Sequence, residues 1–225
     1  MPFAKFTNNV PKQDIFDNQN LRKIMKPGSN TERISTQNHK ASKYIVERTE
    51  KEVPLDGDWD GPVWGFVKPL KVDKYMGQKP EHIPETHAKL LYDDEYVHGI
   101  FRVDDKFVRV VAQGYHSNVW DDSCVEFFFT PGADVSKGYF NMEINAGGSM
   151  LFHWQRARHV DMVEIPVEDC ERIEIYHSLP GKLEPEVQEH MEWFIQFRLP
   201  IDILEKYMEV GRPGESAIWR ANLYK

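Results

Sequence analysis

The sequence predicts an all-β fold, a two-sheet antiparallel β-sandwich of the jelly-roll or immunoglobulin-like type. Apolar and polar residues alternate with a period of two in at least five segments, and turn residues separate these segments. A period of two places successive side chains on opposite faces of a strand, so each segment can bury one face. Helical spacing is convincing only in Ile201–Met208, where Pro200 can begin the helix. We therefore expect one short helix near the C-terminus.

The expected strands are short and follow one another along the chain. They are Tyr44–Glu47, Lys89–Tyr92, Tyr96–Val103, Val108–Ala112, Cys124–Phe129, Tyr139–Asn145, a strand that ends near Trp154, Arg172–His177, Glu192–Leu199 and Trp219–Tyr224. Their apolar faces predict a core made of Val125, Phe127, Phe129, Phe140, Met142, Ile144, Phe101, Val103 and Phe197.

Length and composition predict one large β domain. Residues 1–40 are polar, with no sustained period, and form an N-terminal extension before a domain over residues 41–225. The net charge of −8 and the pI near 5.6 argue against a nucleic-acid partner. No apolar run could span a bilayer and no signal peptide begins the chain, so we expect a soluble, cytoplasmic protein. A chain trimmed of its leader would look the same, so secretion stays open. The oligomeric state is left open too.

Two of the expected strands each have one face of hydrogen-bonding groups. Glu126 lies on this face of Cys124–Phe129, and Asn141, Glu143 and Asn145 lie on this face of Tyr139–Asn145. Amides and carboxylates bind sugar hydroxyls, and an indole packs on the C–H face of a sugar ring. With tryptophans nearby, such a face could hold a sugar.

Several segments, in order, resemble the carbohydrate-binding module family nine and its wider DOMON-type relatives. The segments are L-D-G-D-W-D-G-P-V-W at 55–64, K-L-L-Y-D-D-E-Y-V-H-G-I-F-R-V-D-D at 89–105, W-D-D-S-x-V-E at 120–126, Y-F-N-M-E-I-N-A-G-G at 139–148 and W-R-A-N-L-Y at 219–224. The resemblance covers roughly residue 44 to the C-terminus. It implies a non-catalytic carbohydrate-binding domain that serves polysaccharide or oligosaccharide breakdown.

The resemblance also implies a site in which two tryptophans hold a terminal sugar. It carries the first tryptophan to Trp120, the carboxylate to Glu126 and the amide to Asn145. Trp219 is favoured as the second tryptophan, although Trp154 and Trp64 compete with it. The remaining candidates for sugar contacts are the guanidinium of Arg102 and the second carboxylate, Glu143.

The resemblance further implies a structural calcium ion, and no organic cofactor is expected. Oxygen ligands alternate around a glycine turn at Asp56, Asp58 and Asp60. Asp121 and Asp122 are a second candidate pair. An ordinary acidic turn explains the same residues.

Other function classes remain open. A protein-interaction or scaffolding sandwich could keep the fold and lose the sugar site. A glycoside hydrolase would use Glu126 and Glu143 as its two carboxyls. A haem-binding relative would use a Met/His pair of axial ligands, with His153 and His159 near Met142 and Met150 as the candidates. The proline-rich segment Lys68–Thr86 is a long loop, and we predict that its Tyr75, or Trp64, packs near Glu126.

Overall fold

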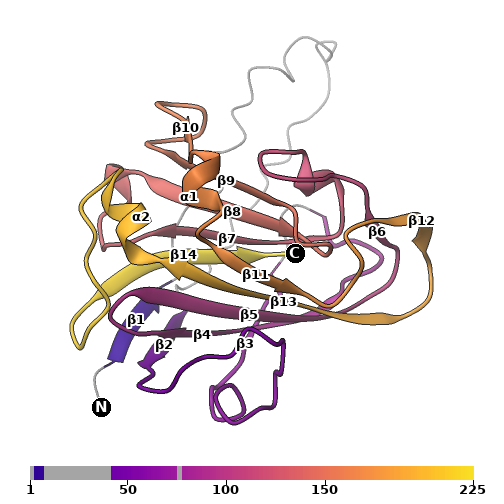
Figure 1. Cartoon of the computed structure of the whole chain (residues 1–225), viewed down its shortest axis with the longest axis horizontal. Coiled ribbons are helices and arrows are strands. Elements are labelled where there is room, and N and C mark those ends of the chain that lie inside the picture. The colour runs from indigo at the N-terminus through magenta and orange to yellow at the C-terminus, as the bar shows by residue number, and fades with distance from the viewer. Residues whose placement is uncertain (1–2, 8–41, 75–77) are drawn as a thin grey trace, which may run out of the picture.

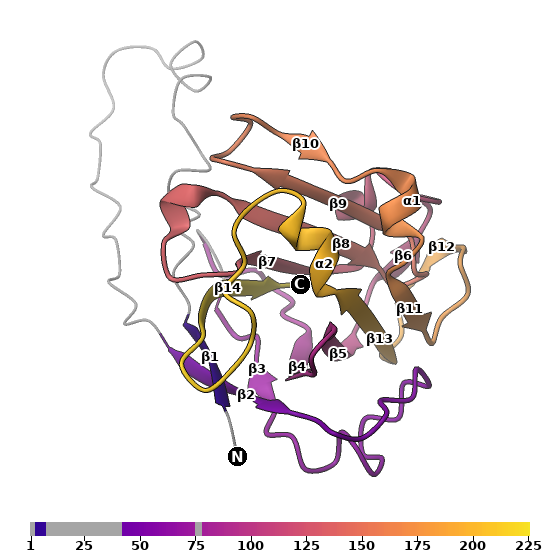
Figure 2. The same cartoon turned by 60° about the vertical axis from the view of Figure 1, so that its left-hand side comes forward.

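The computed structural model describes residues 3–7, 42–74 and 78–225. Two layers of strands pack face to face around one large core, as Figures 1 and 2 show. The predicted fold class, an all-β sandwich, is confirmed. In the described part of the chain, no helix has the length and apolar character needed to cross a membrane.

The first layer carries the polar strand faces that the sequence predicts. In spatial order it contains β10 (Val163–Glu164), β9 (Met150–Gln155), β8 (Tyr139–Asn145), β7 (Cys124–Thr130) and β14 (Ile218–Tyr224). The second layer contains β2 (Lys43–Arg48), β4 (Glu85–Tyr92), β5 (Tyr96–Asp105), β13 (Met191–Pro200) and β11 (Glu174–His177), with β3 (Leu70–Lys71) beside β4. At one end of the sandwich, β6 (Val108–Val110) pairs with β12 (Leu183–Val187).

Strand β1 (Phe3–Thr7) joins the two layers, which the sequence did not predict. It pairs in parallel with β14 and antiparallel with β2, so hydrogen bonds run continuously from one layer to the other. The β2–β4 pair is also parallel, which corrects the expectation of a purely antiparallel sandwich. Apart from β1, the expected extension over residues 1–40 lies outside the described residues.

The helices are shorter and more numerous than expected. Helix α2 covers Ile201–Glu205 and begins after Pro200, as predicted, but it ends before Met208. A second helix, α1 (Val167–Cys170), has too few residues for a helical period to be detected. Buried residues of both helices belong to the main core.

The predicted core is confirmed residue by residue, because each of the nine predicted side chains is at most 1 % exposed. Phe127 of β7 connects the two layers. Its ring stacks on Phe129 at 4.4 Å and on Phe197 of the opposite layer at 5.9 Å. Burying these aromatic rings supplies much of the apolar contact between the layers.

A second, smaller core lies on the outer face of the second layer, under the 53–67 segment (purple in Figure 2). Its residues are Val53, Trp59, Trp64, Val67, Leu91 and Ile100. The ammonium group of Lys89 is buried there. It donates to the carbonyl oxygens of Trp59 and Trp64, both at 2.9 Å, and lies 4.1 Å from the Trp59 ring centroid. Burial lowers the pKa of Lys89.

Gly99 should tolerate no larger residue, because a Cβ there would overlap the Phe197 ring. We expect Gly99→Ala to lower the free energy of unfolding by about 1–3 kcal/mol, since it forces Phe197 away from Phe127. Gly132→Ala is the matched control, because no heavy atom lies within 4 Å of the position that its methyl group would take. Urea unfolding of both variants checks this. Equal stability of the two would contradict the packing described.

Candidate functional site

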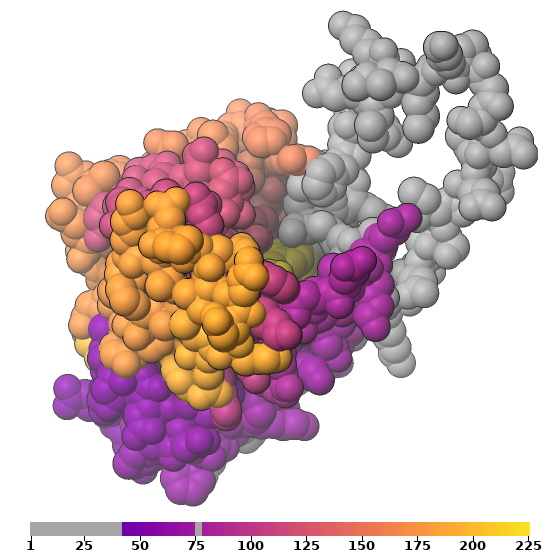
Figure 3. Space-filling model, turned by 90° about the vertical axis from the view of Figure 1, so that its right-hand side faces the viewer, coloured from indigo at the N-terminus to yellow at the C-terminus, as the bar shows by residue number. Residues whose placement is uncertain are grey.

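A cavity of about 630 Å³ lies at the β6–β12 end of the sandwich. Four parts of the chain meet there: the 72–86 loop, the turn from β5 to β6, the start of β7 and the C-terminal end of β14. Figure 3 shows this end of the molecule, with the yellow chain end recessed behind the purple and magenta segments. The described lining residues are Val72, Asp73, Lys74, Pro80, His82, Ile83, Pro84, Thr86, Asp105, Lys106, Phe107, Arg109, Asp121, Asp122, Ser123, Glu126, Glu186, Tyr224 and Lys225.

Glu126 lines the cavity because of its register in the first layer. It lies opposite Tyr224 of β14 on one side and opposite Glu143 of β8 on the other. Directly paired residues of antiparallel strands share a face, so all three side chains lie on the outer face of this layer. Glu126 is partly buried, and Tyr224 lines the same cavity. Burial raises the pKa of Tyr224.

Glu143 supports this face from beside the cavity. Its side chain is buried and accepts a hydrogen bond from Asn141 Nδ2 at 3.1 Å. It is not among the described residues that line the cavity. The two carboxylates are thus brought side by side, as the sequence predicts, but only Glu126 faces the open space.

Asn145 has a different position from the one predicted for a sugar ligand. It is fully buried, and its Nδ2 donates to Asp122 Oδ2 at 3.0 Å and to the Ala112 carbonyl oxygen at 3.0 Å. Its Oδ1 accepts from the backbone N–H groups of Gly147 and Ser149. With these bonds made, the amide cannot reach a bound sugar. The prediction of direct contact is wrong, and Asn145 instead holds Asp122 in place.

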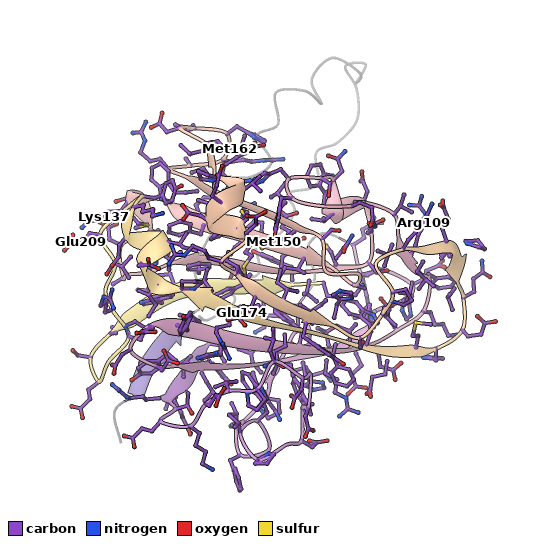
Figure 4. The ribbon with its side chains drawn as sticks, in the orientation of Figure 1. Arg109, Lys137, Met150, Met162, Glu174 and Glu209 are labelled. Atoms are coloured by element: carbon purple, nitrogen blue, oxygen red, sulfur yellow. The ribbon has the colours of Figure 1, made fainter. Side chains whose placement is uncertain are left out.

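Arg109 is one of several cavity residues that the sequence did not predict, with Ser123, Tyr224, Asp105 and Lys225. Its backbone N–H donates to Ser123 Oγ at 3.2 Å, and its guanidinium lies 3.4 Å from Glu184 and 3.9 Å from Asp122. Figure 4 shows Arg109 beside β6 and β12. Val108 and Val110 are buried on the other face of β6. That alternation was visible in the sequence and could have revealed an outward-facing arginine.

The inner end of the cavity is an ion cluster around Asp105, whose side chain is 3 % exposed. Its carboxylate bonds to His82 Nε2 at 2.7 Å, Lys225 Nζ at 2.7 Å and the Lys106 N–H at 2.7 Å. His82 also makes an edge contact with Phe107, with ring centroids 5.7 Å apart. These contacts fasten the 72–86 loop to the β5–β6 turn.

The prediction that Tyr75 or Trp64 packs near Glu126 is not confirmed, although the same loop contributes to the cavity. Residues at both ends of the 72–86 loop line the same cavity as Glu126. Tyr75 lies outside the described residues. Trp64 does not approach Glu126, because it is buried in the second core, on the outer face of the other layer.

Only one of the predicted tryptophan pair lies near the cavity. Trp120 lies in the 3₁₀ turn η3 (Val119–Asp121), is 49 % exposed and precedes the lining residue Asp121. Trp219 is 1 % exposed on the core face of β14, stacked on Phe129 at 5.6 Å, and its Nε1 donates to the Gly211 carbonyl oxygen at 2.6 Å. Successive residues of a strand alternate between its two faces, and Tyr224 and Trp219 are five residues apart, so they lie on opposite faces of β14. The prediction that Trp219 pairs with Trp120 is wrong.

Arg102 is also misplaced by the prediction. It lies on β5, on the outer face of the second layer, where its Nε donates to Glu192 Oε2 at 2.6 Å. It is not among the described lining residues. The alternation along β5 correctly predicts that Arg102 points away from the core. It does not show which of the two layers β5 belongs to.

The aspartates of the 56–60 turn are exposed and do not form a ligand cage. The Asp56 carboxylate accepts from the backbone N–H of Asp58 at 3.0 Å, which closes an ordinary turn. In residues 3–7, 42–74 and 78–225, no three His, Cys, Asp or Glu side chains are grouped so that they could hold a metal ion. The described geometry therefore gives no support for a calcium ion at Asp56, Asp58 and Asp60, and the calcium expectation stays a prediction.

The haem alternative fails on geometry as well. Met142 is 1 % exposed on the core face of β8. His153 of β9 pairs in register with Asn141, so it lies on the opposite face of the layer. Met142 and His153 therefore point away from each other across the layer and cannot be the two axial ligands of one haem. Met150 is also buried on the core face, paired in register with Ile144. His159 lies in the turn after β9, and no contact joins it to Met142 among those described.

Comparison with known proteins places this chain in a family. The sequence model of Carbohydrate-binding family 9 matches residues 67–225. The chain belongs to this family. No curated protein matches it.

One of the solved structures that the chain matches shows the same fold. A candidate carbohydrate-binding protein from Bacteroides uniformis has a TM-score of 0.67 at 23 % identity, over 80 % of this chain and 81 % of that one. A family 9 carbohydrate-binding module from Caldicellulosiruptor kristjanssonii was solved with cellotriose and with glucose. Both structures are 13 % identical to this chain and cover 69 % of it, with 66 % and 68 % of their own length matched and TM-scores of 0.44 and 0.43.

The outer face of the first layer should make stability sensitive to acid. Burial, together with His116 and His159, lowers the pKa of His153 from 6.5 to about 4. As the pH falls from 7 toward 4, His153 becomes protonated in the unfolded chain but stays neutral in the folded chain. Protonation therefore favours the unfolded chain, and the free energy of unfolding decreases over this range. Between pH 7.5 and pH 5, the free energy of unfolding should decrease by about 1–2 kcal/mol less in His153→Gln than in the wild type. Urea unfolding at the two pH values measures this difference.

His190→Gln is the control for this measurement, because the His190 side chain is 67 % exposed. This variant reports the effect of removing an exposed histidine that contacts Asp104. A His153→Gln variant that follows the wild type would show that His153 protonates freely in the folded protein.

Proposed function

We propose that this chain binds a carbohydrate in the cavity between the 72–86 loop and the ends of β7 and β14. The observation that carries the proposal is that Glu126, the carboxylate matched by the family resemblance, faces this cavity beside Arg109, Ser123 and Tyr224. A carboxylate accepts from two neighbouring hydroxyls, and a guanidinium donates to ring or hydroxyl oxygens. A cavity of about 630 Å³ lies within the usual range of small-ligand sites.

Trp120 supplies the aromatic part of the proposed site. Its indole is half-exposed next to Asp121, and a sugar ring entering the cavity can pack its C–H face on such a ring. Phe107, which is 46 % exposed, lies at the cavity as well. We propose Trp120 as the stacking residue, with Glu126 and Arg109 as the hydrogen-bonding residues. Glu143 and Asn145 act indirectly, by holding the groups around them.

We further propose that binding serves polysaccharide or oligosaccharide breakdown. A binding domain contributes to such a process by raising the local concentration of the sugar chain near an enzyme. Support for this part comes from family membership alone.

One observation favours the rival class, a protein-interaction domain. Val160, Met162, Val163 and Val167 are each at least 40 % exposed and surround the edge strand β10. Figure 4 shows Met162 away from Arg109, so this apolar edge is separate from the cavity. Titration calorimetry with a panel of mono- and disaccharides separates the classes. Absence of binding at millimolar sugar would leave the interaction domain as the better account.

Trp120→Ala should abolish or strongly weaken sugar binding while changing the melting temperature little, because half of the side chain is already exposed. Calorimetry and thermal unfolding measure the two effects separately. Phe66→Ala is the matched control. Phe66 is 83 % exposed, is not among the described lining residues, and should affect neither quantity. A stable Trp120→Ala protein that binds as tightly as the wild type would remove Trp120 from the site.

Glu126→Gln should weaken binding by about 1.5–3 kcal/mol, because it removes a charge-assisted hydrogen bond to the sugar. Glu192→Gln is the control, since Glu192 is paired with Arg102 on the other layer. Both variants are measured by calorimetry against the best sugar of the panel. If the control weakens binding as much as Glu126→Gln, the proposed position of the site is wrong.

A further inference from the structure

Two fully buried polar atoms near the cavity have no hydrogen-bond partner in the described part of the chain. They are Oγ1 of Thr86 on β4 and Nε1 of Trp193 on β13, and both residues are 0 % exposed. Thr86 on β4 and Trp193 on β13 are both paired in register with Val103 of β5, which lies between these two strands. The side chains of Thr86 and Trp193 therefore lie on the same face of the second layer. Native proteins rarely leave such atoms without a partner, so each one needs an explanation.

The position of these atoms points to the inner end of the cavity. Thr86 lines the cavity together with Asp105 and Lys225. Asp105 is two residues beyond Val103 on the same strand and therefore shares its face. The Lys225 ammonium that pairs with Asp105 lies 5.6 Å from the centroid of the Trp193 ring. Thr86 thus lines the cavity together with Asp105, and the Trp193 ring lies behind the cluster, close to the Lys225 ammonium, without being among the described lining residues.

The charges at this inner end already have partners. Asp105 is paired with Lys225 and His82 and accepts the Lys106 N–H. What remains is a neutral N–H donor on Trp193 and a neutral hydroxyl on Thr86. A sugar hydroxyl can accept from the indole N–H and can donate to or accept from the threonine hydroxyl. It satisfies both groups without adding a charge beside the buried Asp105 carboxylate.

We propose that the inner end is a subsite for the exocyclic hydroxymethyl group of a hexose, and that Thr86 determines specificity for hexoses over pentoses. This inference rests on the proposed carbohydrate binding in the same cavity. The hydroxymethyl arm extends beyond the ring by one carbon, toward the inner end of the cavity that Thr86 lines. A pentopyranose lacks this arm and leaves Thr86 Oγ1 unpaired.

A hexuronic acid should be rejected by the same subsite. Its carboxylate accepts hydrogen bonds but does not donate, and it would lie beside Asp105. Six carboxylates line the cavity against four lysine or arginine side chains among the described residues. The like charge opposes this ligand.

The test is calorimetric titration of the full chain with matched sugars. The probes are D-glucose with D-xylose, D-galactose with L-arabinose and D-mannose with D-lyxose, each pair differing by the hydroxymethyl group, and D-glucuronate. For at least one pair we expect the hexose to bind roughly tenfold more tightly than the pentose, the equivalent of one buried hydrogen bond, and glucuronate to bind more weakly than glucose.

Thr86→Val removes the hydroxyl at nearly constant volume. It should lower hexose affinity roughly tenfold, leave pentose affinity unchanged and leave the melting temperature unchanged or higher, because an unpaired buried hydroxyl is lost. Thr130→Val is the matched control. Thr130 is equally buried, but its Oγ1 donates to the Gly138 carbonyl oxygen at 2.8 Å, so this variant should lose stability and keep the hexose preference.

Three outcomes would overturn the inference. Equal affinity for hexose and pentose, or an equal loss for both in Thr86→Val, would refute the subsite while leaving carbohydrate binding intact. Tight glucuronate binding would show that the inner end takes a carboxylate instead. If no sugar binds, the proposed function itself fails, and the subsite fails with it.

Discussion

The Asp122 carboxylate is the contact on which the geometry of the cavity depends. Its Oδ2 accepts three hydrogen bonds, from the N–H groups of Val111 and Ala112 and from the Asn145 amide, at 2.8–3.0 Å. The side chain is 2 % exposed, so a carboxylate without these donors would be costly to bury. The three donors come from the segment after β6 and from the end of β8. One side chain therefore fixes the corner from which Arg109, Ser123 and Glu126 face the cavity.

The two-residue period of the strands explains why the sequence predicted so much of the fold. Phe127 and Phe129 alternate with Glu126 and Phe128 along β7, and the same parity on β8 separates Met142 from Glu143. Parity alone gives the correct face for every one of these residues. Short strands such as β3 and β10 have two residues each and carry no detectable period. They form because longer neighbours offer hydrogen bonds to them.

The site was harder to predict because parity gives the face of a strand and not its layer. Arg102 and Glu126 both have outward parity, yet β5 and β7 belong to opposite layers. Trp219 failed for a different reason: its parity places it in the core, and a resemblance based on position along the chain overrode that signal. Asp105 and Lys225 are 120 residues apart, and their 2.7 Å contact arises only from tertiary packing. Local sequence patterns do not predict such a long-range contact.

The most direct measurement of the central claim is a nuclear magnetic resonance titration of the ¹⁵N-labelled chain with the best-binding sugar. The account predicts that the largest amide shifts fall in residues 105–126, in the 78–86 part of the loop and at the end of β14, with little change at Asp56–Asp60 or around Arg102. Shifts concentrated on the 53–67 segment or around β10, with the cavity residues unmoved, would contradict it.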